Sequence, residues 1–175
     1  METQQLRFST ISEIIDWRDK HQLITGKIAM QKLIFLIQKK GLFLNYYYKM
    51  FTYGPFSSEL MNDLDVLEFN NGIVIDWDEK LEGYKIRKGT DYNKYHNTFE
   101  DKEIEIIDRV LENFGTKKSR ELELTSTIIF LNDNFKLDAQ ELKHEIIKIK
   151  PKFSEKEIDA AQMELKNLGY YSYKK

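Results

Sequence analysis

The feature that most constrains the fold is a helix-length segment, residues 27–40, that is apolar on nearly every side around its centre. Residues 33–37 read "LIFLI" without a polar interruption. A helix that is apolar all round has to be covered on all sides by other elements of the protein. The segment ends before Gly41, a residue suited to the left-handed conformation at a helix end. We therefore expect residues 27–40 to form a buried central helix around which the rest of the chain packs.

The composition is that of an ordinary globular protein without an obvious electrostatic target. The chain has 175 residues, of which 41% are hydrophobic and 32% charged, and its formal net charge is −2. This balance supplies no overall attraction to nucleic acid or to an anionic membrane. The absence of cysteine excludes disulfides and thiolate-based sites and fits a reducing compartment. Because "METQQLRFST" lacks a signal-peptide core and the longest apolar run is too short to span a bilayer, we expect a cytoplasmic protein without a membrane segment.

Two further segments flank the central helix. Thr10 and Glu13 form a candidate capping box for a first helix that runs to about His21. Residues 45–52 are rich in aromatic side chains and predict a strand. Because side chains alternate along a strand, the outer two of the three tyrosines at positions 46–48 share one face, and we expect one set to pack in the core.

The stretch "FTYGPFSSEL" predicts a tight turn followed at once by a helix. Gly54 suits a backbone conformation that a Cβ would strain, and Pro55 fixes the entry to the helix. Ser57 is a good N-cap residue for that helix. A second clear helix start lies near the end of the chain, where Ser154 and Glu157 form a candidate capping box.

The remaining elements divide the chain into two parts. Residues 73–77 and 84–87 predict the two strands of a hairpin. The resulting order of helix, helix, strand, helix and hairpin is that of a winged helix, and it covers residues 1–95. Residues 96–175 are helical and end in two helices around a short turn at Pro151, which resembles a truncated second helix-turn-helix. We expect an α+β, predominantly α-helical fold whose two parts pack together as one compact unit.

Three pieces of the sequence together carry a resemblance to a known family. The run "KLIFLIQ" at residues 32–38 is followed by "FTYGPFSSEL" at residues 51–60 and by "DLD" at residues 63–65. This combination resembles the YwgA-like proteins and, more distantly, the Panacea-domain, SocA-like antitoxins, whose hallmark is a Lys-Leu-rich helix followed by a Tyr-Gly-Pro turn. The resemblance covers residues 25–70. It implies a non-catalytic regulator of the kind often found beside toxins or phage-defence genes.

The helix after the turn carries four carboxylates and neither Lys nor Arg. A helix that reads DNA lies between phosphates, which such carboxylates would repel. We predict that this helix and the turn bind a protein partner, such as a toxin or a defence effector with a basic surface. A solvated face whose acidic residues suit the helix dipole is the open alternative. The predicted protein-binding residues are Tyr53, Gly54, Pro55, Glu59, Asp63, Asp65 and Glu68.

The alternative function is that of a winged-helix transcriptional regulator that binds DNA. The basic residues available for this role lie on the second strand of the hairpin and around the turn at Pro151. For the second group, a solvated helix end that complements the dipole is the favoured explanation, and a phosphate contact is the alternative. The candidate nucleic-acid-binding residues are Lys85, Arg87, Lys88, Lys148, Lys150 and Lys152.

An enzyme is the third hypothesis and has the least support in the sequence. His21, His96 and His144 are far apart, and "HEIIK" lacks the second histidine of a zinc-binding helix. No phosphate-binding glycine loop and no nucleophile elbow occurs in the sequence. We therefore expect a non-enzymatic protein with no cofactor and no metal, and a homodimer is compatible with the sequence.

Overall fold

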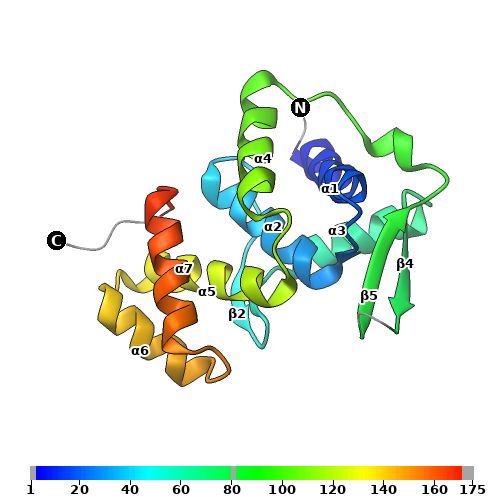
Figure 1. Cartoon of the computed structure of the whole chain (residues 1–175). Helices are drawn as coiled ribbons and strands as arrows, with labels where there is room; N and C mark the ends of the chain where they lie inside the picture. The colour runs from blue at the N-terminus through cyan, green and yellow to red at the C-terminus, as the bar shows by residue number, and fades with distance from the viewer. Residues whose placement is uncertain (1–2, 80–81, 171–175) are drawn as a thin grey trace.

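The computed structural model describes residues 3–79 and 82–170, and Figure 1 shows a mostly helical molecule with a β-hairpin at one edge. The class is α+β and mostly helical, as predicted. In chain order the elements are α1 (Thr3–Lys20), β1 (Thr25–Gly26), α2 (Lys27–Lys40), β2 (Lys49–Phe51), β3 (Gly54–Phe56), α3 (Ser58–Phe69), β4 (Ile73–Asp78), β5 (Gly83–Lys88), the 3-10 helix η1 (Tyr92–Tyr95), α4 (Asp101–Phe114), α5 (Ser119–Phe135), α6 (Ala139–Ile149) and α7 (Glu155–Asn167).

Helix α2 is the buried centre of the molecule, as its composition predicted. All five residues at positions 33–37 are inaccessible to solvent. The helix packs against α1, α4 and α5 and against strands of both sheets. It ends where predicted, at Gly41, which has a φ of 120°. Since burying a large aliphatic or aromatic side chain is worth roughly 1.5–3 kcal/mol, each of these five residues contributes substantially to the stability of the core.

The strands form two small antiparallel sheets. The predicted hairpin is confirmed as β4 and β5, with Ile75 opposite Ile86. Strand β1 pairs with the other side of β5, opposite Lys85 and Ile86, which gives the strand order β1-β5-β4. Strands β2 and β3 form the second sheet and flank the Tyr-Gly-Pro turn, with Phe51 opposite Gly54.

The predicted strand at residues 45–52 is shorter than expected, because only Lys49–Phe51 pairs with another strand. Upstream, the side chain of Gln38 accepts the N–H of Tyr46 at 2.8 Å and donates to the carbonyl oxygen of Tyr46 at 2.9 Å. These bonds satisfy the backbone in place of a neighbouring strand. The side-chain alternation is nevertheless as predicted, since the outer two tyrosines of positions 46–48 are buried and the middle one is exposed.

The first helix is longer than the sequence suggested. Helix α1 already includes Thr3, so the predicted capping box of Thr10 and Glu13 is wrong. Thr10 lies inside the helix, where its hydroxyl donates to the carbonyl oxygen of Leu6 at 2.7 Å. The Glu13 carboxylate instead lies 3.3 Å from the Nε2 atom of His96. The helix start was missed because its first turn is polar and carries no apolar periodicity.

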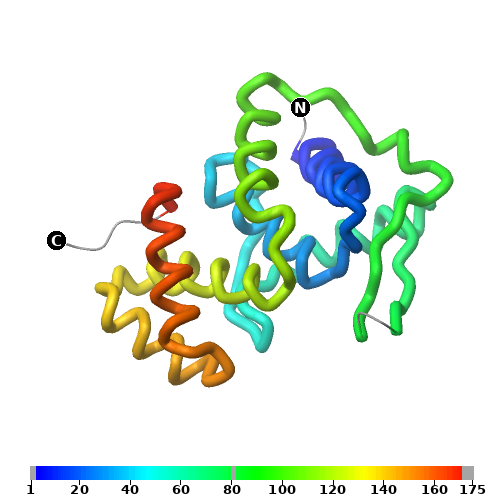
Figure 2. The backbone as a smooth tube through the Cα atoms, in the orientation of Figure 1, coloured from blue at the N-terminus to red at the C-terminus, as the bar shows by residue number. Residues whose placement is uncertain are grey.

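The predicted pair of helices around Pro151 is present as α6 and α7. Asp138 and Ser154 are their N-caps, and each belongs to a capping box. The two helices pack on each other and on α5, at the end of the molecule opposite to the hairpin of β4 and β5 (Figure 2).

Buried side chains from Leu6 to Leu165 belong to one connected hydrophobic core. Within the described ranges, no helix combines the length and the apolarity that a membrane span requires.

Candidate functional site

The Tyr-Gly-Pro turn joins β2 to β3, and its geometry demands glycine. Gly54 has a φ of +86°, a conformation that L side chains rarely adopt. A Cβ on Gly54 would lie 3.0 Å from the hydroxyl of Thr127 and 3.4 Å from the carbonyl oxygen of Glu123, both on α5. The turn therefore rests directly on α5, and the predicted need for glycine agrees with both its backbone conformation and its contacts.

Helix α2 holds the segment after the turn through two polar side chains. Gln31 accepts the N–H of Ser57 and donates to its carbonyl oxygen, both at 2.9 Å. Lys32 is buried, and its Nζ donates to the carbonyl oxygen of Pro55. Burial lowers the pKa of Lys32 to about 7, although the Glu123 carboxylate acts in the opposite direction. The lysine that opens the run "KLIFLIQ" is thus a hydrogen-bond donor to the turn.

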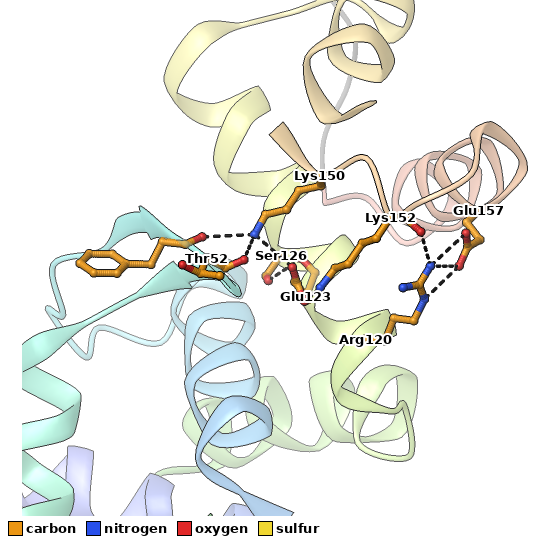
Figure 3. Close-up of polar contacts among 8 residues, drawn as sticks. Thr52, Arg120, Glu123, Ser126, Lys150, Lys152 and Glu157 are labelled. Atoms are coloured by element: carbon orange, nitrogen blue, oxygen red, sulfur yellow. Dashed lines mark hydrogen bonds and ion pairs between the residues drawn. The ribbon is translucent and has the colours of Figure 1, made fainter. Parts of the chain in front are cut away.

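A buried carboxylate and two lysines lie beside the turn, and one of these lysines contacts its backbone (Figure 3). Lys150 Nζ donates to the carbonyl oxygens of Phe51 and Thr52. The Glu123 carboxylate, on α5, lies 3.0 Å from Lys150 Nζ and 2.7 Å from Lys152 Nζ. Since Lys150 is only 6% exposed, it is not part of a free basic surface. Of the three lysines predicted to form a basic spot around Pro151, Lys150 is therefore an internal support of the turn, whereas Lys148 and Lys152 remain exposed.

Three of the four other predicted nucleic-acid-binding side chains form ion pairs within the protein. Lys85 lies opposite Asp76 in the hairpin and is half-buried. The ion pairs are Arg87 with Asp76, Lys88 with Asp16 and Asp19, and Lys148 with Glu145. A phosphate contact by these three cations would first have to break intramolecular ion pairs.

Asp63, predicted to face a partner, is buried. Its Oδ2 atom accepts a hydrogen bond from the Tyr46 hydroxyl at 2.7 Å and lies 3.6 Å from the guanidinium of Arg7. Burial raises the pKa of Asp63, while the hydrogen bond from Tyr46 and the charge of Arg7 lower it. The expectation of a solvent-facing carboxylate is wrong at this position, because the compensating cation comes from α1 and not from α3 itself.

Two more carboxylates of α3 accept backbone N–H groups of neighbouring segments. Glu59 accepts the N–H of Tyr47 at 2.7 Å, and Glu68 accepts the N–H of Ile75 at 2.9 Å. Strand β4 is an edge strand, so Glu68 satisfies a backbone group that no other strand covers. Asp65 is exposed. The prediction that α3 is a partner surface therefore depends on Asp65 and on the accessible parts of the two glutamates.

His96 has the most acidic surroundings of the three histidines. Its Nε2 atom lies 3.0 Å from Asp16 and 3.3 Å from Glu13, both on α1. In the part of the chain that the structure describes, no group of three or more His, Asp or Glu side chains is arranged to hold a metal ion. These contacts connect α1 to the segment after η1.

A groove runs between the Tyr-Gly-Pro turn and the hairpin of β4 and β5, and the sequence indicated only part of it. An inner pocket of about 420 Å³ and an outer pocket of about 280 Å³ share Lys27, Ile28, Tyr53 and Tyr84. We call the two pockets together the aromatic groove. Four of its aromatic residues are at least half exposed, and clusters of exposed apolar side chains commonly mark interaction sites. They are Phe51, Tyr53, Trp77 and Tyr84.

Comparison with known proteins connects this geometry with a family. The family described as "Antitoxin SocA-like, Panacea domain" matches residues 30–128, more than half of the chain. The chain belongs to this SocA-like Panacea family. It is also similar to the uncharacterized protein YwgA of Bacillus subtilis (strain 168), with 28% identity over 149 residues that cover 83% of this chain and 87% of the relative. The resemblance seen in the sequence is thereby confirmed.

The Panacea match includes most of what surrounds the turn. It begins within α2 before Gln31 and Lys32, contains the turn, α3 and the hairpin, and ends within α5 after Glu123. The four exposed aromatic residues of the groove all lie inside it. Lys150 and the helices α6 and α7 lie outside it. In this chain the exposed aromatic side chains of the groove thus belong to the Panacea region. Lys150, which donates hydrogen bonds to the turn, lies outside that region.

Proposed function

We propose that this Panacea protein is an antitoxin-type regulator that acts by binding a protein partner and catalyses no reaction itself. The observation that carries the proposal is the match to the SocA-like antitoxin family over the residues that expose their aromatic side chains in the groove. A protein that neutralises a partner by contact needs an exposed surface that gains free energy when it is covered. The partner in this proposal is a toxin or a phage-defence effector.

The contact surface in this proposal is the aromatic groove and not the acidic face of α3. Aromatic residues are enriched at the centres of protein interfaces and often dominate their binding energy. Covering them is worth roughly 25 cal/mol for each Å² of apolar surface removed from water. By contrast, the carboxylate of Asp63 is buried and those of Glu59 and Glu68 accept hydrogen bonds inside the protein.

The proposal includes a winged-helix-like N-terminal part in which the hairpin serves protein contact. It is supported by the order of helices and strands and by β1, which extends the hairpin to three strands. The tip of this hairpin contributes Trp77 and Tyr84 to the groove. A wing that reads DNA would instead present free cations, but Arg87 and Lys88 are paired with carboxylates.

A toxicity screen tests the proposal. Random fragments of the source genome are expressed from an inducible promoter in two bacterial strains, only one of which also produces this chain. We expect fragments encoding one toxin to be recovered only in the strain that produces the chain, and the toxin to co-purify with the tagged chain. Equal recovery of all fragments in the two strains would contradict an antitoxin function. Retention of the chain on its own promoter DNA at about 200 mM salt would favour the DNA-binding alternative.

A further inference from the structure

The aromatic groove is biased towards positive charge. Lys27 and Lys32 line its inner pocket, and no carboxylate does so among the described residues. The outer pocket adds one carboxylate, that of Glu82. Lys152 lines neither pocket, but its Nζ lies 5.5 Å from the centre of the Tyr53 ring, which lines both. A ligand that enters between these aromatic rings therefore meets more cations than anions.

The buried cluster beneath the turn increases this bias. Lys32, Lys150 and Lys152 share the single buried carboxylate of Glu123. Charges in a poorly hydrated environment act more strongly than charges in water, so this excess of cations extends into the inner pocket. Because burial holds the pKa of Lys32 near 7, an anion bound in the pocket would also favour the protonated form of this side chain.

The first turn of α2 adds a further positive element where the two pockets meet. Its N-cap is Gly26, which has no side chain to accept a hydrogen bond from the first amides of the helix. Lys27 is the first residue of the helix, and its Nζ lies 4.6 Å from the centre of the Tyr84 ring. Helix N-termini favour negative charge, so Lys27 and the helix dipole act in the same direction.

We infer that the groove binds a segment of the partner protein in which a large apolar side chain is flanked by Asp or Glu. The inference rests on the proposed function, because it names the chemistry of the partner at that surface. The apolar side chain enters the inner pocket beside Phe56 and Met61. One flanking carboxylate faces Lys27, which lines both pockets, and the other faces Lys152, whose Nζ lies beside the Tyr53 ring. This partner chemistry is opposite to the basic surface that the carboxylates of α3 suggested.

Aromatic rings and cations together also suit single-stranded nucleic acid, but the distribution of charge favours a peptide. Nucleic-acid channels need a row of exposed cations that follows the phosphates, in addition to rings on which bases stack. Here Lys32 and Lys150 are almost inaccessible, with exposures of 2% and 6%. Lys27, where the two pockets meet, and Lys152, beside Tyr53, leave positions for one or two carboxylates and not for a chain of phosphates.

Selection from a random peptide library displayed on phage tests this inference with the full chain as the target. We expect the recovered peptides to combine a Trp, Phe or Leu with neighbouring Asp or Glu. Synthetic, fluorescein-labelled copies are then titrated by fluorescence anisotropy, beside copies in which each acidic residue is replaced by Lys. We expect the acidic peptide to bind at least about tenfold more tightly than its basic copy, with the difference decreasing as salt is added.

Two groove variants and one matched control locate the binding. Tyr84→Ala removes a half-exposed ring, and Lys27→Glu reverses a charge at a helix N-terminus that tolerates acidic residues. Each should weaken binding of the acidic peptide by about tenfold, as expected for a residue central to an interface. Lys156→Glu makes the same charge change in the first turn of α7, outside the groove, and should leave binding unchanged. Circular dichroism confirms that all three variants are folded.

Four outcomes would overturn the inference. The first is a selection that enriches no peptides or only basic ones, and the second is equal peptide binding by the groove variants and the wild type. The third is binding of a labelled oligothymidine that is tighter than peptide binding and that Tyr84→Ala abolishes. The fourth is a dimer, seen by sedimentation, that Tyr84→Ala dissociates. The toxicity screen, repeated with Tyr84→Ala and Lys156→Glu, separates this inference from the proposed function. If the Tyr84 variant still neutralises the toxin, the groove is not the binding site and the antitoxin function is retained. If acidic peptides bind but no toxin is found, the antitoxin function is wrong and the groove remains a peptide-binding site.

Discussion

Helix α3 turns most of its carboxylates towards the protein, whereas the neighbouring aromatic groove leaves its rings half exposed to water. In α3, Asp63 is buried against Tyr46 and Arg7. In the groove, Tyr53 and Tyr84 are 55% and 50% exposed. Residue type alone would have placed the acidic side chains outside and the aromatic ones inside.

The difference separates side chains that support the fold from side chains that remain available for binding. A carboxylate removed from water is costly unless it receives hydrogen bonds or a cation, so the partners of α3 are part of the stability of the fold. An exposed aromatic ring contributes little to folding but gains free energy when another surface covers it. Substitutions in α3 and around the turn should therefore affect stability, while those in the groove should affect binding.

The largest effect is expected for charge reversal at Asp63. Asp63→Lys places a cation beside Arg7 in a buried site and leaves the Tyr46 hydroxyl without its acceptor. We expect a loss of about 3–5 kcal/mol in the free energy of unfolding, as for other broken buried pairs. Asp65→Lys, two residues further on the exposed face, should change it by less than about 0.5 kcal/mol. Urea denaturation of the two variants provides the comparison, and equal stability would show that Asp63 is not a structural residue.

The next effect in size is expected at the turn. Gly54→Val combines a β-branched residue at positive φ with a close contact to the Thr127 hydroxyl. Strain of this kind and overpacking together should cost about 3 kcal/mol. Gly169 also has a positive φ, but a Cβ there would meet no atom within 4 Å. Gly169→Ala should therefore show the backbone cost alone, about 1 kcal/mol, and a melting temperature at wild-type level for Gly54→Val would contradict the assignment.

A pH-dependent effect is expected from Lys32. In the unfolded chain this side chain keeps its ordinary pKa of 10.5, whereas in the folded protein burial lowers the pKa to about 7. The unfolded state therefore binds more protons between about pH 7 and pH 9, so stability rises with pH, by about 2 kcal/mol from this residue. Lys32→Met should remove that rise, and the exposed Lys156→Met should retain it. If urea denaturation gives the same dependence of the unfolding free energy on pH for Lys32→Met and the wild type, the pKa of Lys32 is not lowered.

The smallest effect on stability is expected for Glu68. Glu68→Ala removes the acceptor for the N–H of Ile75 on the edge strand β4. Loss of such a hydrogen bond should cost about 1 kcal/mol, because water partly replaces the carboxylate. Hydrogen exchange should become faster at the Ile75 amide in this variant and remain unchanged in Asp65→Ala. Unchanged exchange at Ile75 would mean that the bond adds no protection.

Features that depend on a few neighbouring residues could be predicted from the sequence. The N-caps at Ser57 and Ser154, the end of α2 at Gly41 and the requirement for Gly54 all follow from local backbone geometry. The burial of α2 also followed from its composition, because an apolar helix has no stable position at the surface.

Features that depend on distant partners could not be predicted. The burial of Asp63 requires Arg7 from α1, and the role of Lys150 requires Thr52, 98 positions away in the chain. The aromatic groove was missed for the same reason. Tyr53 was recognised as part of the turn, but nothing in its neighbourhood indicates that Tyr84 lies across from it. The sequence alone does not show whether a charged side chain is solvated or paired with a distant residue.

The position of Lys150 also limits which parts of the chain can be lost or exchanged during evolution. A chain cut after Phe135 would keep every residue of the Panacea match but would lose the two lysines beside the buried Glu123 carboxylate. Lys32 would then be the remaining cation near Glu123, and it is itself buried with a lowered pKa, so such a shortened chain should be less stable unless Glu123 also changes. The terminal helices are therefore not an independent module that recombination can exchange freely, and we expect family members without them to carry a neutral residue in place of this glutamate.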